Sequence, residues 1–139
     1  MVQNNKMDKK ETLLHLQQQP LNPWHDQQSL IEEVNPAELY LLNLNSKESI
    51  RSMRSRLNSV AKVFGDYDAQ NAPWVRLNRL LVAKIRTQLI NNGASGSTVG
   101  SYLSAIKGVA KAAWLEGQMQ HQTYLQILAV KAPKAMAVR

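Results

Sequence analysis

Residues Ser97 to Met119 read STVGSYLSAIKGVAKAAWLEGQM, and this stretch decides the fold of the chain. Its apolar residues recur at intervals of three and four, the spacing that places side chains on one face of an α-helix. Eight side chains are expected on this buried face: Val99, Tyr102, Leu103, Ile106, Val109, Ala110, Ala113 and Trp114. The sequence therefore predicts one long central helix that ends at Gly117.

The opposite face of this helix is small, polar and basic. It consists of Gly100, Ser101, Ser104, Lys107, Gly108 and Lys111 and contains no carboxylate. Hydroxyls and lysines bind phosphate, and small side chains allow close approach, so the face has the chemistry of a nucleic-acid contact. Two alternatives remain, an ordinary solvated face and a face for close helix packing. For this helix taken alone, they are favoured over a nucleic-acid contact.

Charge is distributed unevenly along the 139 residues, whose formal net charge is +7. Residues 1–45 hold three cations and six carboxylates, whereas residues 46–139 hold fourteen cations and four carboxylates. A polyanion is the natural partner for such a charge distribution. A membrane surface could also supply the negative charge, but no stretch approaches the roughly 18–20 apolar residues that a spanning helix needs.

Residues 1–34 are rich in Gln and Asn and contain two prolines, which predicts a flexible leader ahead of a single domain. The alternative is that Trp24, Leu30 and Ile31 dock on the domain or on a partner. The leader lacks the apolar core of a secretory signal, so the cytoplasm is the expected location. The chain has no cysteine, which rules out disulfides and thiolate metal sites.

Two helices are expected before the middle of the chain. Asn35 as N-cap with Pro36 after it predicts a short, largely buried helix over residues 36–44. Ser46 predicts the start of a second helix over residues 47–64, and Gly65 predicts its end. The outer side of this second helix carries another basic and polar set: Lys47, Arg51, Arg54, Ser55, Asn58 and Lys62.

Two further helices complete the expected all-α fold, a compact bundle of four to five helices. Trp74 is expected to begin one helix, which Asn92 and Gly93 end. A last short helix is expected over residues 121–130, ahead of Pro133. Its inward side chains are expected to be Tyr124, Leu125, Leu128 and Ala129.

Residues that could support catalysis or hold a cofactor do not gather in the sequence. The histidines His15, His25 and His121 are far apart, and no triad or metal site is expected. The pair Asp66 and Asp68 is expected to cap a turn. No glycine-rich phosphate loop has the spacing of a nucleotide site. The sequence therefore predicts no catalytic residue, no metal and no cofactor.

Three segments carry a family resemblance: NPAELYLLNL from Asn35, SIRSMR from Ser49 and, most specifically, TVGSYLSAIKGVAKAAWLEGQM from Thr98. Over about residues 35–135 the chain resembles the core-binding, SAM-like domain of tyrosine recombinases of the phage-integrase type. In that family four or five helices form half of a clamp around duplex DNA, and the second and fourth helices lie against the major groove and phosphates. The resemblance implies ten contacts: Lys47, Arg51, Arg54, Asn58, Ser97, Thr98, Ser101, Ser104, Lys107 and Lys111.

In the family, a separate C-terminal catalytic domain performs the cleavage, and residues 1–139 are expected to contain no such domain. Residues 131–139 are therefore expected to be a basic linker, and the chain is expected not to be an enzyme by itself. The resemblance implies double-stranded DNA as partner, sister protomers for the full-length protein, a monomeric isolated domain and a place on the bacterial nucleoid during recombination. The alternative is a basic helical domain that binds an acidic protein or sister protomers.

Overall fold

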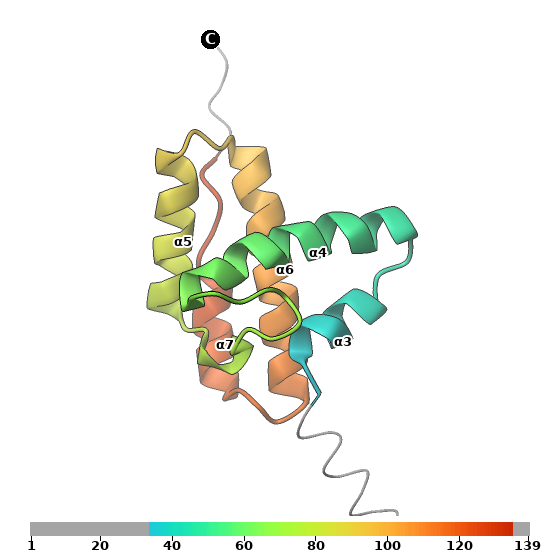
Figure 1. The fold of residues 1–139 in the computed structure, drawn as a ribbon. Coiled ribbons are helices and arrows are strands. Elements are labelled where there is room, and N and C mark those ends of the chain that lie inside the picture. Colours follow the sequence, from blue (N-terminus) through green and yellow to red (C-terminus); the bar gives the residue numbers. More distant parts are fainter. Residues whose placement is uncertain (1–33, 135–139) are drawn as a thin grey trace, which may run out of the picture. The chain divides into compact units, whose positions relative to one another are not determined.

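The computed structural model describes residues 34–134, and these fold as an all-helical bundle (Figure 1). This confirms the predicted fold class. The helices are α3 (Pro36–Leu42), α4 (Lys47–Ala61), α5 (Arg79–Asn91), α6 (Gly96–Leu115) and α7 (His121–Leu128), with 3₁₀ turns at Lys62–Phe64 and Trp74–Arg76. The predicted leader lies outside the described residues apart from Val34, as do residues 135–139 of the predicted linker.

The long helix α6 is the centre of the bundle, and each of the other four α-helices packs against it. Six of its predicted inward side chains are fully or almost fully buried: Val99, Leu103, Ile106, Val109, Ala110 and Ala113. Tyr102 and Trp114 are half-buried at the edges of this face. Ala105 is buried as well, which the sequence analysis did not predict.

Most helix ends lie within a few residues of the positions predicted from the capping residues. The Asn35 side chain accepts from the amides of Ala37 and Glu38, and Ser46 accepts from Ser49. Positive φ angles occur at Gly65 (134°), Gly93 (92°) and Gly117 (76°), where the predicted helices stop, because glycine adopts this conformation without strain. The first helix is shorter than predicted, and Leu42 at its end is 77% exposed.

Trp74 does not begin a long helix, so that prediction was wrong. It begins a single 3₁₀ turn, and Leu77 then adopts an extended ψ of 142°. The Asn78 side chain accepts from the amide of Leu81 and caps α5 one residue before Arg79. The buried indole of Trp74 donates to the carbonyl oxygen of Ala69 at 2.8 Å, so this residue fixes the preceding loop rather than a helix.

The buried side of α7 also differs from the prediction. Leu125 is 49% exposed and Ala129 is exposed, whereas Ile127 is fully buried. The rings of Trp114 and Tyr124 stack with centroids 5.2 Å apart and help to set the rotation of α7. Eight residues make little more than two turns, so the sequence pattern of α7 was too short to define its face.

After α7 the chain turns back along α6 in a segment that we call the strap, residues 130–134 (Figure 1). Val130 is buried, and Ala132 lies over Gly100 of α6. The guanidinium Nε of Arg86 in α5 donates to the carbonyl oxygen of Lys131. The first residues of the predicted linker are thus held between α5 and α6 and reach the end of the bundle where α6 begins.

Candidate nucleic-acid interface

The helices α4 and α6 form the two walls of a shallow open groove. Its lining consists of Arg51, Ser52, Ser55, Arg56, Thr98 and Tyr102. Two of these six, Arg51 and Thr98, are among the ten predicted contacts. The groove therefore joins the two predicted basic helices at one place, and its lining contains guanidinium and hydroxyl groups without a carboxylate.

Arg56 is the groove residue that sequence reasoning missed. Its guanidinium carbon lies 5.8 Å from the centroid of the Tyr102 ring, and its Nη1 donates to the carbonyl oxygen of Ser52 at 3.2 Å. Arg56 falls off the periodic arc defined by Lys47 and Arg51, so its helical spacing gave no signal. The feature that identifies Arg56 is its contact with the Tyr102 ring of α6. This contact can be recognised only from the arrangement of α4 and α6 in space.

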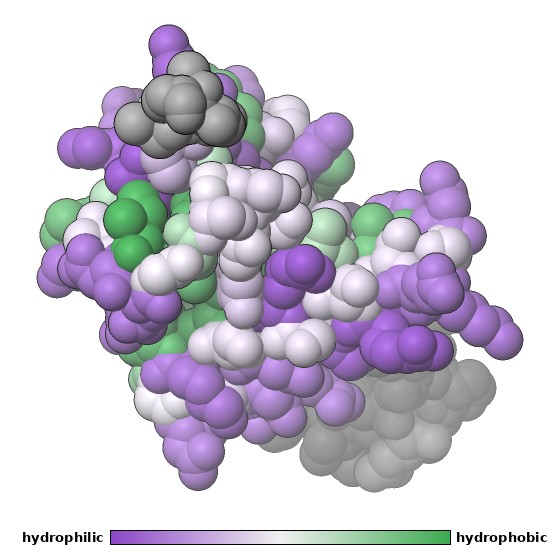
Figure 2. All heavy atoms as spheres, turned by 90° about the horizontal axis from the view of Figure 1, so that it is seen from above, coloured by the Kyte–Doolittle hydropathy of each residue, from purple (hydrophilic) through white to green (hydrophobic). Residues whose placement is uncertain are grey.

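The beginning of α6 lies at the same end of the bundle. Ser95 caps the helix by accepting from the amide of Thr98, while Ser97 and Thr98 are exposed. A helix N-terminus carries partial positive charge and presents unpaired amides, which favours anions. Figure 2 looks onto this end, where weakly polar residues, drawn pale, occupy the centre of the face and strongly hydrophilic residues lie beside them.

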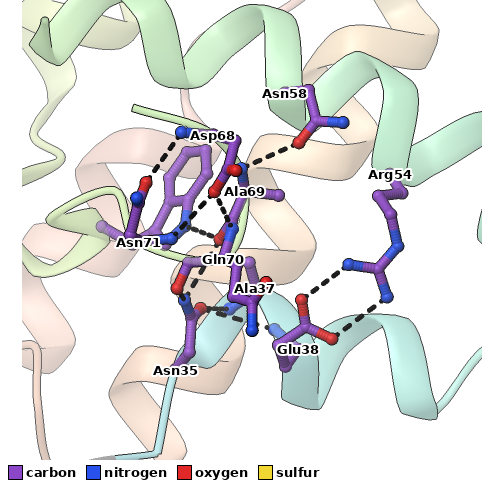
Figure 3. A network of polar contacts seen from close by, with 10 residues as sticks. Asn35, Ala37, Glu38, Arg54, Asn58, Asp68, Ala69, Gln70 and Asn71 are labelled. Carbon is purple, nitrogen blue, oxygen red and sulfur yellow. Dashed lines mark hydrogen bonds and ion pairs between the residues drawn. The ribbon is translucent and has the colours of Figure 1, made fainter. Parts of the chain in front are cut away.

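Two of the predicted DNA contacts, Arg54 and Asn58, bond to other residues of the domain. Arg54 forms a bidentate ion pair with Glu38, with N–O distances of 2.7 and 3.1 Å (Figure 3). The hydrogen bond to Glu38 raises the pKa of Arg54 above its ordinary value. Asn58 Oδ1 accepts from the amide of buried Ala69 at 2.8 Å. Both side chains therefore tie α4 to neighbouring parts of the chain.

The loop that Asn58 holds is built from several other short polar contacts (Figure 3). Asp68 Oδ1 accepts from the amides of Gln70 at 2.9 Å and Asn71 at 3.2 Å, so the predicted turn is confirmed for Asp68. Asn35 Nδ2 donates to the carbonyl oxygens of Ala69 and Gln70. This loop thus fixes the start of α3 against the last turn of α4.

The remaining predicted contacts spread over the outside of α4 and α6. Lys47, Ser104 and Lys111 are exposed, and Ser101 and Lys107 are half-buried. Burial and the nearby charge of Lys131 lower the pKa of Lys107 below its ordinary value.

Close helix packing, one of the alternatives left open by the sequence, applies to Gly108 of this face. Gly108 lies against Tyr40 and Gly100 against the strap. The contact with Tyr40 leaves no room for a Cβ at residue 108, whereas a Cβ at residue 100 would meet Ala132 at an ordinary 3.8 Å.

Other site types find no support in residues 34–134. No three His, Asp or Glu side chains in this range come together as potential metal ligands. Within the same range, no helix is long and apolar enough to cross a membrane. His121 is exposed and stacks on Trp114 at 4.5 Å between ring centroids. The α4–α6 groove is taken as the candidate site because its lining combines arginine and hydroxyl groups from both predicted basic helices.

Comparison with known proteins adds no family assignment: no family model, curated protein or solved structure matches the chain.

Proposed function

We propose that the helical domain binds duplex DNA through α4 and α6, as the core-binding domain of a protein of the tyrosine-recombinase type. The observation that supports this proposal is the groove in which Arg51 and Arg56 face Thr98 and Tyr102. The family resemblance, most specific in the Thr98–Met119 run, implies contact by the same two helices. The cationic excess of residues 46–139 supplies the charge that a DNA backbone requires.

The groove side chains suit phosphate contacts. Arginine presents several N–H donors in a planar fork that matches phosphate oxygens, and serine and threonine hydroxyls donate to the same oxygens. The start of α6 adds amide groups and a favourable dipole. Contacts of this kind fix a protein on the duplex with little sequence discrimination, so the isolated domain should bind weakly, with Kd roughly 10⁻⁴ to 10⁻⁶ M at physiological salt.

On this proposal the domain supplies grip and performs no strand cleavage itself. Joined to a catalytic domain it would form one jaw of a clamp, and each jaw would raise the effective concentration of the other at the DNA. Sister protomers would then meet on one recombination site. A catalytic domain with this jaw should bind the site more tightly than the same domain without it.

The direct test is a fluorescence anisotropy titration of duplex DNA at several salt concentrations. If about six cations engage phosphates, the slope of log affinity against log salt should be about −5. The double variant Arg51→Ala/Arg56→Ala should make this slope shallower by about 2. The charge-matched control is Arg79→Ala/Lys84→Ala, in the half of α5 farther from the start of α6, and it should retain the original slope.

Three results would contradict DNA binding by this face. They are no binding at low salt, binding that does not respond to salt, and equal loss in the α5 control. Thermal unfolding of both double variants checks that the domain remains folded. Binding to an acidic protein without any binding to DNA would support the alternative of a protein-interaction domain.

A further inference from the structure

The strap lies on the side of α6 away from the α4 groove. At about 100° per residue along an α-helix, Gly100 falls about 160° around the axis from Thr98, which lines the groove. Gly100 contacts Ala132 of the strap: a Cβ added at Gly100 would lie 3.8 Å from the Cβ of Ala132. A Cβ added at Gly96 would lie only 3.0 Å from the carbonyl oxygen of Pro133. The strap thus lies directly on α6 at both positions, and the contact is tight at Gly96.

A serine stripe occupies the arc between these two sides of α6. The same rotation places Ser101, Ser97 and Ser104 in this order from the groove side toward the strap side. Ser97 and Ser104 are exposed and Ser101 is half-buried. The stripe therefore has Arg51 and Arg56 along one edge and the strap along the other.

The strap edge is also cationic. Lys131 is exposed, and its carbonyl oxygen is held by Arg86 Nε. On the same helical rotation Lys107 falls about 180° from Thr98, on the strap side of α6, where it is half-buried. Neither lysine forms an ion pair with a carboxylate of residues 34–134. Holding two like charges together is unfavourable, and a bound anion between or beside them relieves the repulsion.

We propose that Lys107 and the docked strap residue Lys131 form a second phosphate-binding edge, so that duplex DNA lies across the serine stripe and is held from both sides of α6. This inference rests on the proposed DNA binding and adds the strap to the surface. The lowered pKa of Lys107, caused by burial and by Lys131, agrees with a cation pair that lacks an anionic partner. The strap thereby forms part of the DNA-binding surface.

The experiment uses the full chain and a duplex in the anisotropy titration described above. The variant Lys107→Gln/Lys131→Gln should make the salt slope shallower by about 2 and lower the affinity about tenfold per lost contact near 0.1 M salt. The matched control Arg79→Gln/Lys84→Gln removes the same charge from α5 and should bind as the unmodified chain does. The unfolding temperature of the lysine variant should be no lower than that of the unmodified chain, because the substitution removes a partly desolvated cation.

The two levels of the proposal fail differently. If the unmodified chain binds duplex with a steep salt slope and the lysine variant behaves in the same way, the strap edge is wrong and the α4–α6 groove stands. An equal loss in the α5 control would also overturn the strap edge, because the effect would then follow net charge alone. If the unmodified chain does not bind duplex at low salt, both proposals are wrong.

A second variant separates docking from charge. Gly100→Leu keeps every cation but places a large side chain where Ala132 lies, so it should displace the strap and weaken binding. If a folded Gly100→Leu chain binds DNA with unchanged affinity, a docked strap is not required and the inference is overturned. The smaller change Gly100→Ala should preserve both the strap and the affinity.

Discussion

Gly108 of α6 lies directly beneath the phenol ring of Tyr40 in α3, which contacts the place where a side chain would begin. A Cβ at this position would lie well inside van der Waals distance of the ring carbons Cδ1 and Cε1. The two helices can approach this closely only because residue 108 has no side chain. The relationship fixes α3 against the lower half of α6 and explains a glycine in the middle of a long helix.

The variant Gly108→Ala should therefore destabilise the domain. Alanine favours a helix interior by about 1 kcal/mol over glycine, but overpacking against Tyr40 costs typically 1–3 kcal/mol. The net expectation is a loss of up to about 2 kcal/mol in the free energy of unfolding, measured by chemical denaturation.

Gly100→Ala is the matched control, because its Cβ would meet Ala132 at an ordinary 3.8 Å. It should be neutral or stabilising by up to about 1 kcal/mol. Equal effects of the two substitutions would show that the contact with Tyr40 does not restrict residue 108.

Tyr40 also predicts a pH dependence. Burial raises the pKa of Tyr40 above its ordinary value of about 10, an effect that the positive charge of Arg56 partly offsets. The unfolded chain therefore loses this proton at lower pH than the folded chain, and the stabilisation, complete below about pH 10, is lost as pH rises through the folded pKa. Between pH 8 and pH 11 the free energy of unfolding, measured by denaturation, should decline less for Tyr40→Phe than for the unmodified chain. Identical declines would mean that Tyr40 ionises equally in both states.

Local sequence signals predicted the elements of this fold well, because their physical causes are local. Asn35, Ser46 and Gly117 act on backbone groups within a few residues, so caps and stops can be recognised along the chain. The buried side of α6 could be predicted because twenty residues repeat the pattern over several turns. The eight residues of α7 repeat it too briefly, and tertiary packing decided which side is buried.

The candidate site was less predictable because its members depend on contacts between elements. Arg54 looks like a surface cation on a helical wheel, yet Glu38, sixteen residues earlier, pairs with it. Asn58 looks like a polar contact residue, yet a loop eleven residues later uses its oxygen. Arg56 belongs to the groove because its guanidinium lies over the Tyr102 ring of α6. The strap packs on α6 at Gly96 and Gly100, a contact between distant segments that the sequence did not predict.

The corrected face of α7 gives a stability prediction. Ile127→Ala should cost about 2–5 kcal/mol, because it removes methyl groups from a fully buried site and leaves a cavity. Leu125→Ala is the matched control on the same helix, and at 49% exposure it should change stability by no more than about 0.5 kcal/mol. Thermal unfolding measures both. A larger loss for Leu125→Ala would restore the face that the sequence first predicted.

The ion pair of Arg54 separates it from the other arginines of α4. Because Glu38 already occupies its guanidinium in a bidentate contact, Arg54→Ala should weaken DNA binding less than Arg51→Ala does. Its effect on stability should be small, about 0.2–1 kcal/mol, since the Arg54 side chain is 41% exposed. Anisotropy titrations of the two single variants compare the DNA effects directly. A greater loss for Arg54→Ala would show that this arginine leaves Glu38 for phosphate.

Asn58 provides a test of structural against DNA-contacting roles. Asn58→Ala removes the acceptor for the amide of buried Ala69, and an unsatisfied buried amide costs about 1–3 kcal/mol. Asn58→Asp keeps an oxygen at the same position, so it should retain most of this stability while adding a negative charge to the outer side of α4. Denaturation and DNA titration of both variants distinguish the two roles. If Asn58 holds the loop, alanine lowers stability and aspartate does not. If Asn58→Ala unfolds as the unmodified chain does but binds DNA more weakly, its main role is contact with DNA and the structural assignment is wrong.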